Sequence, residues 1–243
     1  MLKNVNRILI IKLRDIGDIV LSTPVIQTMY ENCNSPKIVY VLKKEYENFK
    51  YLLPHVSEVI TYDKKSILNL ITLIFRLRRY KFDIAINLHA TFRSALITRL
   101  SGAKLRLVHN HSGKDWFTSA PLGIKEEPKP ITLRDLETLK PLAIKMPPLN
   151  SIKTKLTIKE KDIKYIDDHP DANTVGFGIG AKRPAKMWKT ANFIELGKIL
   201  TEKKMKIAVF ASYAERELGL QIVNALGNNA KLYCGLDFLK LAF

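Results

Sequence analysis

Cysteine is scarce in this sequence, and its scarcity excludes two classes of protein. Only two of the 243 residues are cysteines, and Cys33 and Cys234 lie far apart, in neither a CxxC pattern nor a cluster with histidine. A small disulfide-bonded secreted domain and a zinc-binding domain both need more cysteines at closer spacing. The sequence therefore favours a protein of a reducing compartment.

Long apolar stretches are also missing. The N-terminus has neither the apolar core nor the small-residue cleavage site of a signal peptide. The longest apolar stretch, residues 67–75, is interrupted by Asn69 and Thr72 and is far shorter than the roughly 20 residues that a membrane-spanning helix needs. We therefore expect a cytoplasmic protein, which can still touch a membrane surface.

Acidic residues are few compared with basic ones. The chain has 40 lysines and arginines against 23 aspartates and glutamates, a formal net charge of +17. Such a charge favours partners rich in phosphate, namely nucleic acids, phosphorylated lipids or nucleotides, although a solvated basic surface explains it equally well. The basic residues are not interleaved with aromatic side chains on which bases could stack, so we do not expect nucleic acid as a partner.

Strand-like and helix-like segments alternate along the chain, which is typical of α/β proteins with parallel sheets. The first strand, residues 7–13, is short, continuous and rich in β-branched residues, as a fully buried strand is. We predict further strands at 37–42, 59–62, 83–88 and 105–109, and helices at 19–32, 44–53, 66–80 and 91–101.

Two adjacent prolines, Pro147 and Pro148, mark the end of this first α/β domain. We predict a first domain over residues 1–146 and a linker with an interdomain helix over 147–173. A capping box opens that helix at Thr157, and the helix reaches Asp168. A partial second α/β domain follows over residues 174–243.

The second domain is predicted to be truncated. Three strands make only about half of a doubly wound sheet, and the last would keep an open apolar edge. The predicted strands are 175–178, 206–210 and 231–233, and a last helix begins at 237–243. The helix at 191–203 has an apolar face of Phe193, Leu196, Ile199 and Leu200, and the next helix, ended by Gly227, has one of Leu218, Ile222, Ala225 and Leu226.

The segment after the first strand carries the first candidate site residue, Asp18. Residues 14–18 are predicted to form a turn, in which Gly17 permits a tight bend or a positive φ. Ligands bind at the carboxyl ends of the strands in such sheets, so Asp18 is placed to accept a proton from an attacking substrate hydroxyl. The alternative is that Asp18 only caps the helix that follows or favours its dipole.

A glycine-rich run at 176–188 follows the first strand of the second domain. Its glycines, Gly180 among them, let a backbone approach phosphates. Arg183 replaces the third glycine of a GxGxxG pattern, which disfavours a hydride-transferring enzyme. Lys182, Arg183 and Lys186 instead supply cations for a pyrophosphate, which they can stabilise as a leaving group. A solvated basic loop is the alternative.

Glu215 comes just after the second strand of this domain. An acidic residue in this neighbourhood commonly binds ribose hydroxyls in nucleotide-binding folds. A first-turn helix glutamate explains the position equally well.

Three segments together carry a family resemblance. They are the opening strand with Gly17-Asp18 and Thr23-Pro24, the segment Arg93-Ser94-Ala95-Leu96 leading to Leu100-Ser101-Gly102-Ala103, and the run from Gly180 to Trp188. In these segments, and in order from residue 7 to its end, the sequence resembles glycosyltransferase family 9, the heptosyltransferase-type enzymes of lipopolysaccharide core assembly.

The resemblance implies a GT-B fold, with two facing Rossmann-like domains and the active site between them. It implies metal-independent, inverting transfer of a heptose from ADP-heptose, a nucleotide-sugar donor, to a phosphorylated glycolipid acceptor, with no cofactor. Asp18 matches the family's catalytic aspartate, Lys186 its donor-phosphate lysine and Glu215 its ribose-binding glutamate. Lys182 departs from the small hydroxyl residue common in the family, and the family's late Asp-Thr-Gly-x-x-His loop is absent here.

Candidate acceptor-binding residues lie in the first domain. They are Gly17, His89 at the carboxyl end of a strand, and Arg93. Three further arginines, Arg76, Arg78 and Arg79, either meet acceptor phosphates or form a solvated face. The pair His109-x-His111 is interpreted as a surface loop rather than a metal site, and Trp188 as a packing residue.

We therefore expect a monomeric glycosyltransferase of heptosyltransferase type, which truncation can leave inactive. Peripheral contact with the cytoplasmic face of the inner membrane is expected. The alternative hypothesis is a non-catalytic fragment that binds an anionic glycolipid.

Overall fold

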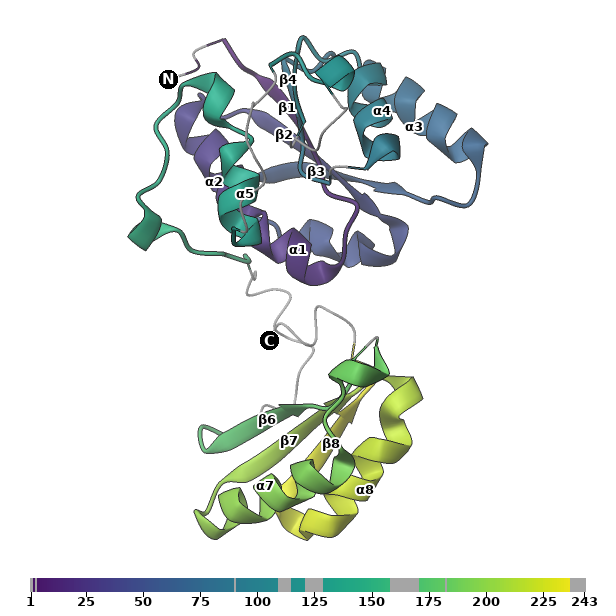
Figure 1. Ribbon diagram of the computed structural model, residues 1–243, viewed down its shortest axis with the longest axis vertical. Coiled ribbons are helices and arrows are strands. Elements are labelled where there is room, and N and C mark those ends of the chain that lie inside the picture. Colours follow the sequence, from purple (N-terminus) through teal and green to yellow (C-terminus); the bar gives the residue numbers. More distant parts are fainter. Residues whose placement is uncertain are drawn as a thin grey trace. The chain divides into compact units, whose positions relative to one another are not determined.

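The chain forms two compact units, Met1–Thr157 and Ile158–Phe243, in a computed structural model (Figure 1). The structure describes residues 2, 4–89, 91–108, 115–120, 129–157, 171–181 and 183–236. The two units are taken in turn.

The first unit is built on a five-stranded parallel sheet of order β3-β2-β1-β4-β5. The predicted strands are confirmed, with ends shifted by up to three residues. The chain places β2 and β3 on one side of β1, then returns to place β4 and β5 on the other side. The order therefore reverses between β1 and β4, the point at which α/β sheets bind ligands. The strands are β1 Arg7–Ile11, β2 Lys37–Lys43, β3 Val56–Tyr62, β4 Ile84–Asn87 and β5 Leu105–Val108.

Helices cover both faces of this sheet. Right-handed crossovers in opposite directions place α1 and α2 on one face and α3 and α4 on the other (Figure 1). The helix α5 packs against α1 and α2. The helices are α1 Ile16–Leu21, α2 Thr23–Asn32, α3 Ile67–Arg78, α4 Phe92–Leu100 and α5 Ile131–Glu137, with 3-10 turns η1 Lys44–Tyr51, η2 Asp115–Phe117, η3 Lys140–Leu142 and η4 Leu149–Ser151.

The single helix predicted at 19–32 is wrong, because the chain breaks at Ser22 into α1 and α2. Pro24 has no N–H to donate to the carbonyl of Val20, and the Thr23 hydroxyl donates to that carbonyl instead, at 2.8 Å. The Ser22 hydroxyl donates to the Ile19 carbonyl and bonds the Tyr40 hydroxyl of β2, both at 2.7 Å. Side-chain bonds thus replace the helix ladder and anchor the break to the sheet.

The strand β1 is the centre of the core. Its last four residues, from Ile8 to Ile11, are fully buried, as predicted for a strand covered on both faces. Leu9 and Ile11 pack into the cluster formed by α3 and α4, to which Leu70 and Leu73 of α3 contribute. Because side chains alternate along a strand, Ile8 and Ile10 face the opposite layer.

The second unit contains a three-stranded parallel sheet of order β6-β7-β8 among its described residues. Both crossovers run in the same direction, so α7 and α8 cover the same face (Figure 1). Gly227, with φ of 59°, ends α8 as predicted. The elements are β6 Thr174–Gly178, η5 Pro184–Lys186, α7 Thr190–Glu202, β7 Lys206–Ala211, η6 Tyr213–Glu215, α8 Arg216–Leu226, η7 Gly227–Asn229 and β8 Ala230–Cys234.

The predicted apolar faces of α7 and α8 are wrong at one position each. Ile199 is 47% exposed and Ala225 is exposed, whereas Ile194 and Val223 pack on the core. The cause on α7 is a glycine, because Gly197 is the buried centre of its contact face. When a glycine lies at the centre of a helix contact face, the pattern of apolar residues alone does not locate that face correctly.

The first half of the predicted linker belongs to the first unit. The Lys155 N–H donates to the Thr23 hydroxyl at 3.0 Å, and the Thr157 N–H donates to the Leu52 carbonyl at 2.7 Å. The division between the units falls after Thr157. The helix predicted from there to Asp168 and the one at 237–243 lie outside the described residues.

Within the described ranges, no helix combines the length and the apolar character needed to cross a bilayer.

Gly197→Val should lower the free energy of unfolding of the second unit. A Cβ atom at position 197 would lie 2.5 Å from Leu226 Cδ1, so the buried Leu226 side chain or the helices must shift, at a cost of about 1–3 kcal/mol. Glu195→Val places the same side chain on an exposed position of α7 and is the matched control. Urea denaturation measures both. Equal stability of the two variants would contradict the packing described here.

Candidate active site

Three buried polar atoms without a hydrogen-bond partner lie at the carboxyl edge of the first sheet. They are Asp18 Oδ1, Asn87 Nδ2 and His89 Nδ1, and none has a partner among the described residues. Asn87 ends β4 beside Ile11, the last residue of β1, and Asp18 follows β1 in α1. Buried polar atoms are normally paired, and leaving one unpaired costs about 1–3 kcal/mol. This edge is therefore suited to receive polar groups of a ligand.

Asp18 lies in the first turn of α1, not in a loop. The turn predicted over 14–18 is wrong from Ile16 onward, because Gly17 belongs to α1 and has neither the tight bend nor the positive φ considered for it. The N-cap residue of α1 is Asp15 rather than Asp18. The Asp15 carboxylate accepts hydrogen bonds from Lys43 Nζ at 3.3 Å and from the Tyr46 hydroxyl at 3.0 Å. Asp18 therefore does not cap α1, but its place in the first turn fits the alternative that it favours the helix dipole.

A buried ion pair lies at this same edge of the sheet. Lys12, which directly follows β1, donates from Nζ to Asp135 Oδ2 of α5 at 2.5 Å, and each side chain is 1% exposed. Burial lowers the pKa of Lys12 and raises the pKa of Asp135 to about 6, although each partner opposes the shift of the other. The charge of Asp18 raises both pKa values, which places Asp18 within electrostatic reach of the pair.

Sequence reasoning missed this pair. A charged residue within a strand-like apolar run was its only local signal, and its partner lies 123 positions away.

His89 is a neutral group in a cationic surrounding. Burial, and then the charges of Arg14 and Lys64, lower the pKa of His89 to about 4. Its backbone N–H donates to Asn87 Oδ1 at 2.9 Å, which fixes the loop after β4. A neutral imidazole offers one donor and one acceptor nitrogen. His89 can therefore meet a hydroxyl of a ligand whose anionic groups the neighbouring cations attract.

Arg93 lies in the first turn of α4 at the same edge. Its Nη1 donates to the Lys64 carbonyl at 3.2 Å and to the Tyr62 hydroxyl at 3.5 Å. The guanidinium is thus tied to the segment that follows β3. A hollow opens beside it at the ends of β2 and β3, lined by Lys43, Lys44, Glu45, Tyr62, Asp63, Lys64 and Lys65.

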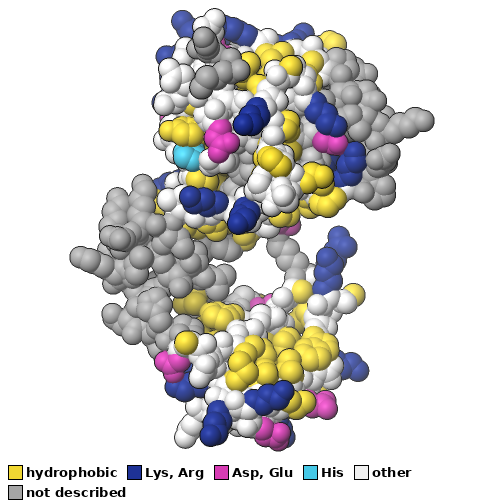
Figure 2. All heavy atoms as spheres, turned by 90° about the vertical axis from the view of Figure 1, so that its left-hand side faces the viewer, with side chains coloured by type: hydrophobic (Ala, Val, Ile, Leu, Met, Phe, Trp, Pro, Cys, Tyr) yellow, Lys and Arg dark blue, Asp and Glu magenta, His cyan; other side chains and the backbone are white. Residues whose placement is uncertain are grey.

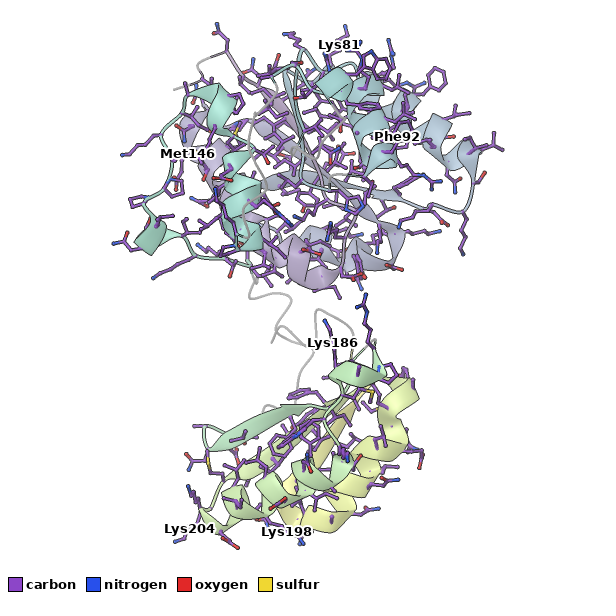
Figure 3. The ribbon with its side chains drawn as sticks, in the orientation of Figure 1. Lys81, Phe92, Met146, Lys186, Lys198 and Lys204 are labelled. Carbon is purple, nitrogen blue, oxygen red and sulfur yellow. The ribbon has the colours of Figure 1, made fainter. Side chains whose placement is uncertain are left out.

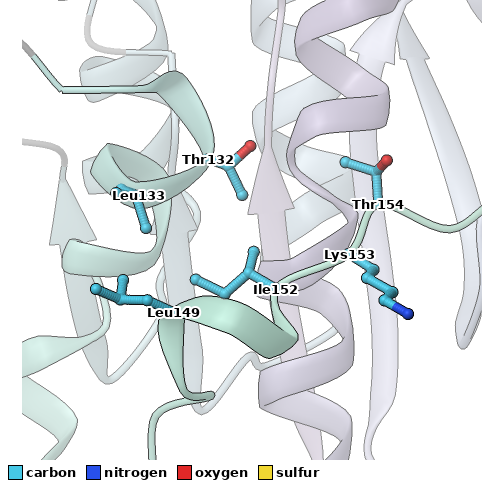
Figure 4. A pocket seen from close by; sticks show the side chains of 6 residues that line it. All are labelled: Thr132, Leu133, Leu149, Ile152, Lys153 and Thr154. Carbon is cyan, nitrogen blue, oxygen red and sulfur yellow. The ribbon is translucent and has the colours of Figure 1, made fainter.

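Another hollow of the first unit offers few groups that could take part in a reaction. It lies between α5 and the segment that contains η4 (Figure 4), and half of its lining residues, Leu133, Leu149 and Ile152, are apolar. Lys153 is its only ionisable residue. We assign it no role in catalysis.

The second unit has its own pocket at the carboxyl ends of its strands. Glu215 lies directly against Gly180 in this pocket, and any side chain at position 180 would collide with the Glu215 carboxylate. Gly180 is therefore required for close approach rather than for a special φ. The lining residues are Gly178, Gly180, Ala181, Phe210, Ala211, Ser212, Tyr213, Glu215, Tyr233, Gly235 and Leu236.

Glu215 also has a structural role. Its Oε2 accepts from the Ser212 N–H at 2.9 Å and from the Ser212 hydroxyl at 2.5 Å, which forms a capping box at the start of η6. The first-turn role considered in the sequence is thus present. The same bonds hold the carboxylate at the pocket, where it can also accept hydrogen bonds from a ligand.

The predicted cationic loop is only partly described. Arg183 precedes η5 and Lys186 ends it, both are exposed, and neither forms a salt bridge within the described part of the chain. Figure 3 shows Lys186 extending from η5 away from the sheet. Trp188 packs edge-on against Phe193, with ring centroids 4.9 Å apart, as predicted for a packing residue. Lys182 lies outside the described residues.

The described residues contain no group of three or more histidine, cysteine, aspartate or glutamate side chains that could hold a metal ion. His109 and His111 lie outside the described residues.

Comparison with known proteins identifies the family. The sequence model of glycosyltransferase family 9 (heptosyltransferase) matches residues 70–236. The chain belongs to this family. The predicted family and enzyme class, a glycosyltransferase, are therefore confirmed. No curated protein sequence matches the chain.

Solved structures of this family share its fold. A family 9 glycosyltransferase from Veillonella parvula DSM 2008 has a TM-score of 0.82 at 21% identity, over 99% of this chain and 72% of that one. ADP-heptose lps heptosyltransferase II of E. coli has a TM-score of 0.79 at 21% identity, over 97% and 75%. E. coli heptosyltransferase WaaC with ADP has a TM-score of 0.78 at 16% identity, over 97% and 77%. The predicted GT-B fold is confirmed.

Lys12→Met should destabilise the first unit by about 3–5 kcal/mol, because it leaves Asp135 buried without a cation. A buried carboxyl whose folded pKa lies above its unfolded value favours the folded state when protonated. Without Lys12 that pKa rises further, so the loss should be small near the unfolded pKa of about 4 and grow as pH rises through 6 and above.

The control is Lys206→Met, which removes the exposed Lys206–Asp171 pair and should leave the stability nearly unchanged at any pH, because exposed ion pairs contribute little. Urea denaturation at acidic and neutral pH compares the two variants. A pH-independent loss for Lys12→Met would contradict the burial of an unpaired carboxyl.

Proposed function

We propose that this chain transfers a heptose from ADP-heptose to a phosphorylated lipopolysaccharide core acceptor, by metal-independent inverting displacement. The observation that carries the proposal is the buried, unpartnered Oδ1 of Asp18 at the carboxyl edge of the first sheet. Membership of family 9 supplies the reaction class. The donor is inferred from two similar proteins, one an ADP-heptose heptosyltransferase and the other solved with ADP.

In this proposal Asp18 is the general base. Its free oxygen accepts the proton of an acceptor hydroxyl while that hydroxyl oxygen attacks the anomeric carbon of the donor. The bond from that carbon to the diphosphate oxygen breaks, and ADP leaves with the electron pair. Attack on the face opposite the leaving group inverts the anomeric centre. The Lys12 ammonium lies within electrostatic reach of Asp18, whose charge raises the pKa of Lys12.

The remaining residues of the first unit are assigned to the acceptor. Arg14, Lys43 and Lys64 give this edge the positive potential that attracts acceptor phosphates. Neutral His89 is proposed to hold an acceptor hydroxyl, and Arg93 to meet an anionic group near its ties to the segment after β3. Gly17 leaves open space beside Asp18, because no atom lies within 4 Å of a Cβ built there.

The second unit is assigned to the donor. Arg183 and Lys186 are proposed to neutralise the charge that develops on the leaving diphosphate, together with Lys182, which stands where the family often has a small hydroxyl residue. Glu215, held by its capping box, is proposed to accept hydrogen bonds from the ribose hydroxyls. Gly180 is proposed to contribute through its position in the same pocket, next to the Glu215 carboxylate.

Nucleic acid is a poor fit as the partner. On the sides of the two units that Figure 2 shows, basic side chains are scattered among acidic and hydrophobic ones and form no continuous basic stripe. Duplex and single-stranded nucleic acids are both recognised by clustered basic residues along their backbone. The positive charge is better explained by phosphorylated small ligands and by the surface described below.

Asp18→Asn should lower kcat by about 100-fold or more, because the amide preserves size but cannot take the proton. The Kd for ADP should not change, since Asp18 is assigned to the acceptor reaction. Asp15→Asn, three residues earlier, is the control and should retain most of the activity. The measurement is transfer from ADP-heptose to a phosphorylated core acceptor. Failure of the unaltered chain with every nucleotide sugar offered would sink the proposal, as would full activity of Asp18→Asn.

Lys186→Ala should weaken ADP binding by roughly 10- to 100-fold, the worth of one charge-assisted hydrogen bond. Lys198→Ala removes another exposed lysine of the same unit, on α7 (Figure 3), and should leave the Kd unchanged. Calorimetry with ADP measures both. Equal affinity in the two variants would remove Lys186 from the donor site, and no ADP binding by the unaltered chain would favour a non-catalytic glycolipid-binding protein.

A further inference from the structure

The outer face of α3 is an apolar stripe that no other described element covers. Ile67, Leu68, Ile71 and Phe75 are between 44% and 70% exposed. Large apolar side chains are common singly on protein surfaces, but four on one helix form a patch that calls for an explanation. We call these four residues the α3 stripe.

The α3 stripe is continuous along the helix. Residues 67, 71 and 75 follow at intervals of four, and 68 adjoins 71 and 75, so all four lie within about 100° of the helix circumference. Leu70, Leu73 and Leu77 occupy the opposite side and are buried in the core. The core face of α3 is therefore fully used for folding, and the stripe is additional.

Basic residues stand at both ends of the stripe. Lys64 and Lys65 precede α3, and Arg78 and Arg79 lie at its C-terminus. All four are exposed, and none forms a salt bridge within the described ranges. The nearby acidic residue Asp63 accepts a hydrogen bond from the Lys65 backbone N–H at 3.0 Å. A bare apolar stripe with two cations at each end is the chemistry of a surface that meets lipid.

We propose that the α3 stripe docks the first unit on a bilayer that contains anionic phospholipid. The stripe would lie in the plane of the interface, with Ile71 and Phe75 below the headgroups. The two lysines and two arginines would meet lipid phosphates. An amphipathic helix binds membranes through buried apolar area together with attraction of its basic residues to anionic lipids.

Charge disfavours a second copy of this chain as the occupant. Both ends of the stripe are positive, so two stripes packed parallel or antiparallel would place like charges side by side. A protein groove is also a poorer match, because the stripe needs cover along its whole length and negative charge at both ends. An anionic bilayer supplies both at once.

The docking surface adjoins the hollow at the ends of β2 and β3. Lys64 and Lys65 belong to both, since they line that hollow and precede α3. A polar head group that projects from the bilayer would thus reach the basic edge near Arg93, whose Nη1 donates to the Lys64 carbonyl. This deepens the proposed function, which requires a lipid-borne acceptor, but the surface itself does not involve Asp18.

The test is flotation of the full chain with vesicles of phosphatidylcholine alone or mixed with phosphatidylglycerol. Binding should need the anionic lipid and weaken as salt is raised. Arg78→Gln with Arg79→Gln should weaken binding roughly 20- to 30-fold, about fivefold for each cation. Lys198→Gln on α7 with Lys203→Gln at its C-cap changes the net charge equally and should weaken vesicle binding less than about threefold.

The apolar arm compares two isoleucines of similar exposure. Ile71→Ser in the stripe should weaken vesicle binding about tenfold, because the loss of most of a buried Ile side chain is worth that much. Ile199→Ser, at 47% exposure on α7, should have no effect. Unchanged thermal melting of both variants establishes that the fold is intact.

Three results would overturn the docking proposal. They are no binding to anionic vesicles, equal loss for Ile71→Ser and Ile199→Ser, or a dimer in sedimentation velocity that Ile71→Ser dissociates while vesicles are not bound. Transfer to a water-soluble acceptor should be unchanged in Ile71→Ser. Vesicle binding without any transferase activity would refute the proposed function and leave the docking surface standing.

Discussion

The first unit depends on one buried ion pair. Lys12 directly follows the central strand of the sheet, and Asp135 comes from the last α-helix of that unit, so their contact at 2.5 Å joins the beginning of the fold to its end. Two such groups are expensive to bury, and each is tolerable only beside the other. Because α5 packs on α1, the pair also fixes the helix that carries Asp18. Lys12 and Asp135 therefore help to fix the position of the proposed base, Asp18, and form part of its electrostatic surroundings, although neither need touch a substrate.

The two units differ in how they arrange polar groups at the carboxyl ends of their strands. In the first, the edge of the sheet keeps polar atoms unpaired, as on Asp18 and His89, and surrounds them with cations. In the second, Glu215 is already bonded to Ser212, and the missing side chain of Gly180 leaves room for its carboxylate. The first edge can gain hydrogen bonds from a ligand, and the second presents a carboxylate whose position is already fixed. Such a division suits an enzyme that must handle two chemically different substrates.

The strands could be predicted because buried parallel strands have a simple signature, short runs of β-branched residues. Features that depend on single side chains competing with the backbone could not. The hydroxyl of Thr23 serves the carbonyl that Pro24 leaves without a donor, and so divides a helix that periodicity alone makes continuous. Gly197 defines a contact face through the absence of a side chain, which no apolar pattern records. The partner of Lys12 is invisible for a different reason, since sequence distance carries no information about which distant carboxylate will meet a buried ammonium.

The same ion pair has a consequence for synthesis of the protein. As the chain leaves the ribosome, all five strands of the first sheet emerge before Asp135 does. Until α5 arrives, Lys12 must remain hydrated, because its burial without a counter-charge would oppose folding. The end of the central strand thus cannot become buried early, although this strand is among the first segments made. We therefore expect the first unit to complete its folding only when α5 supplies the Asp135 carboxylate.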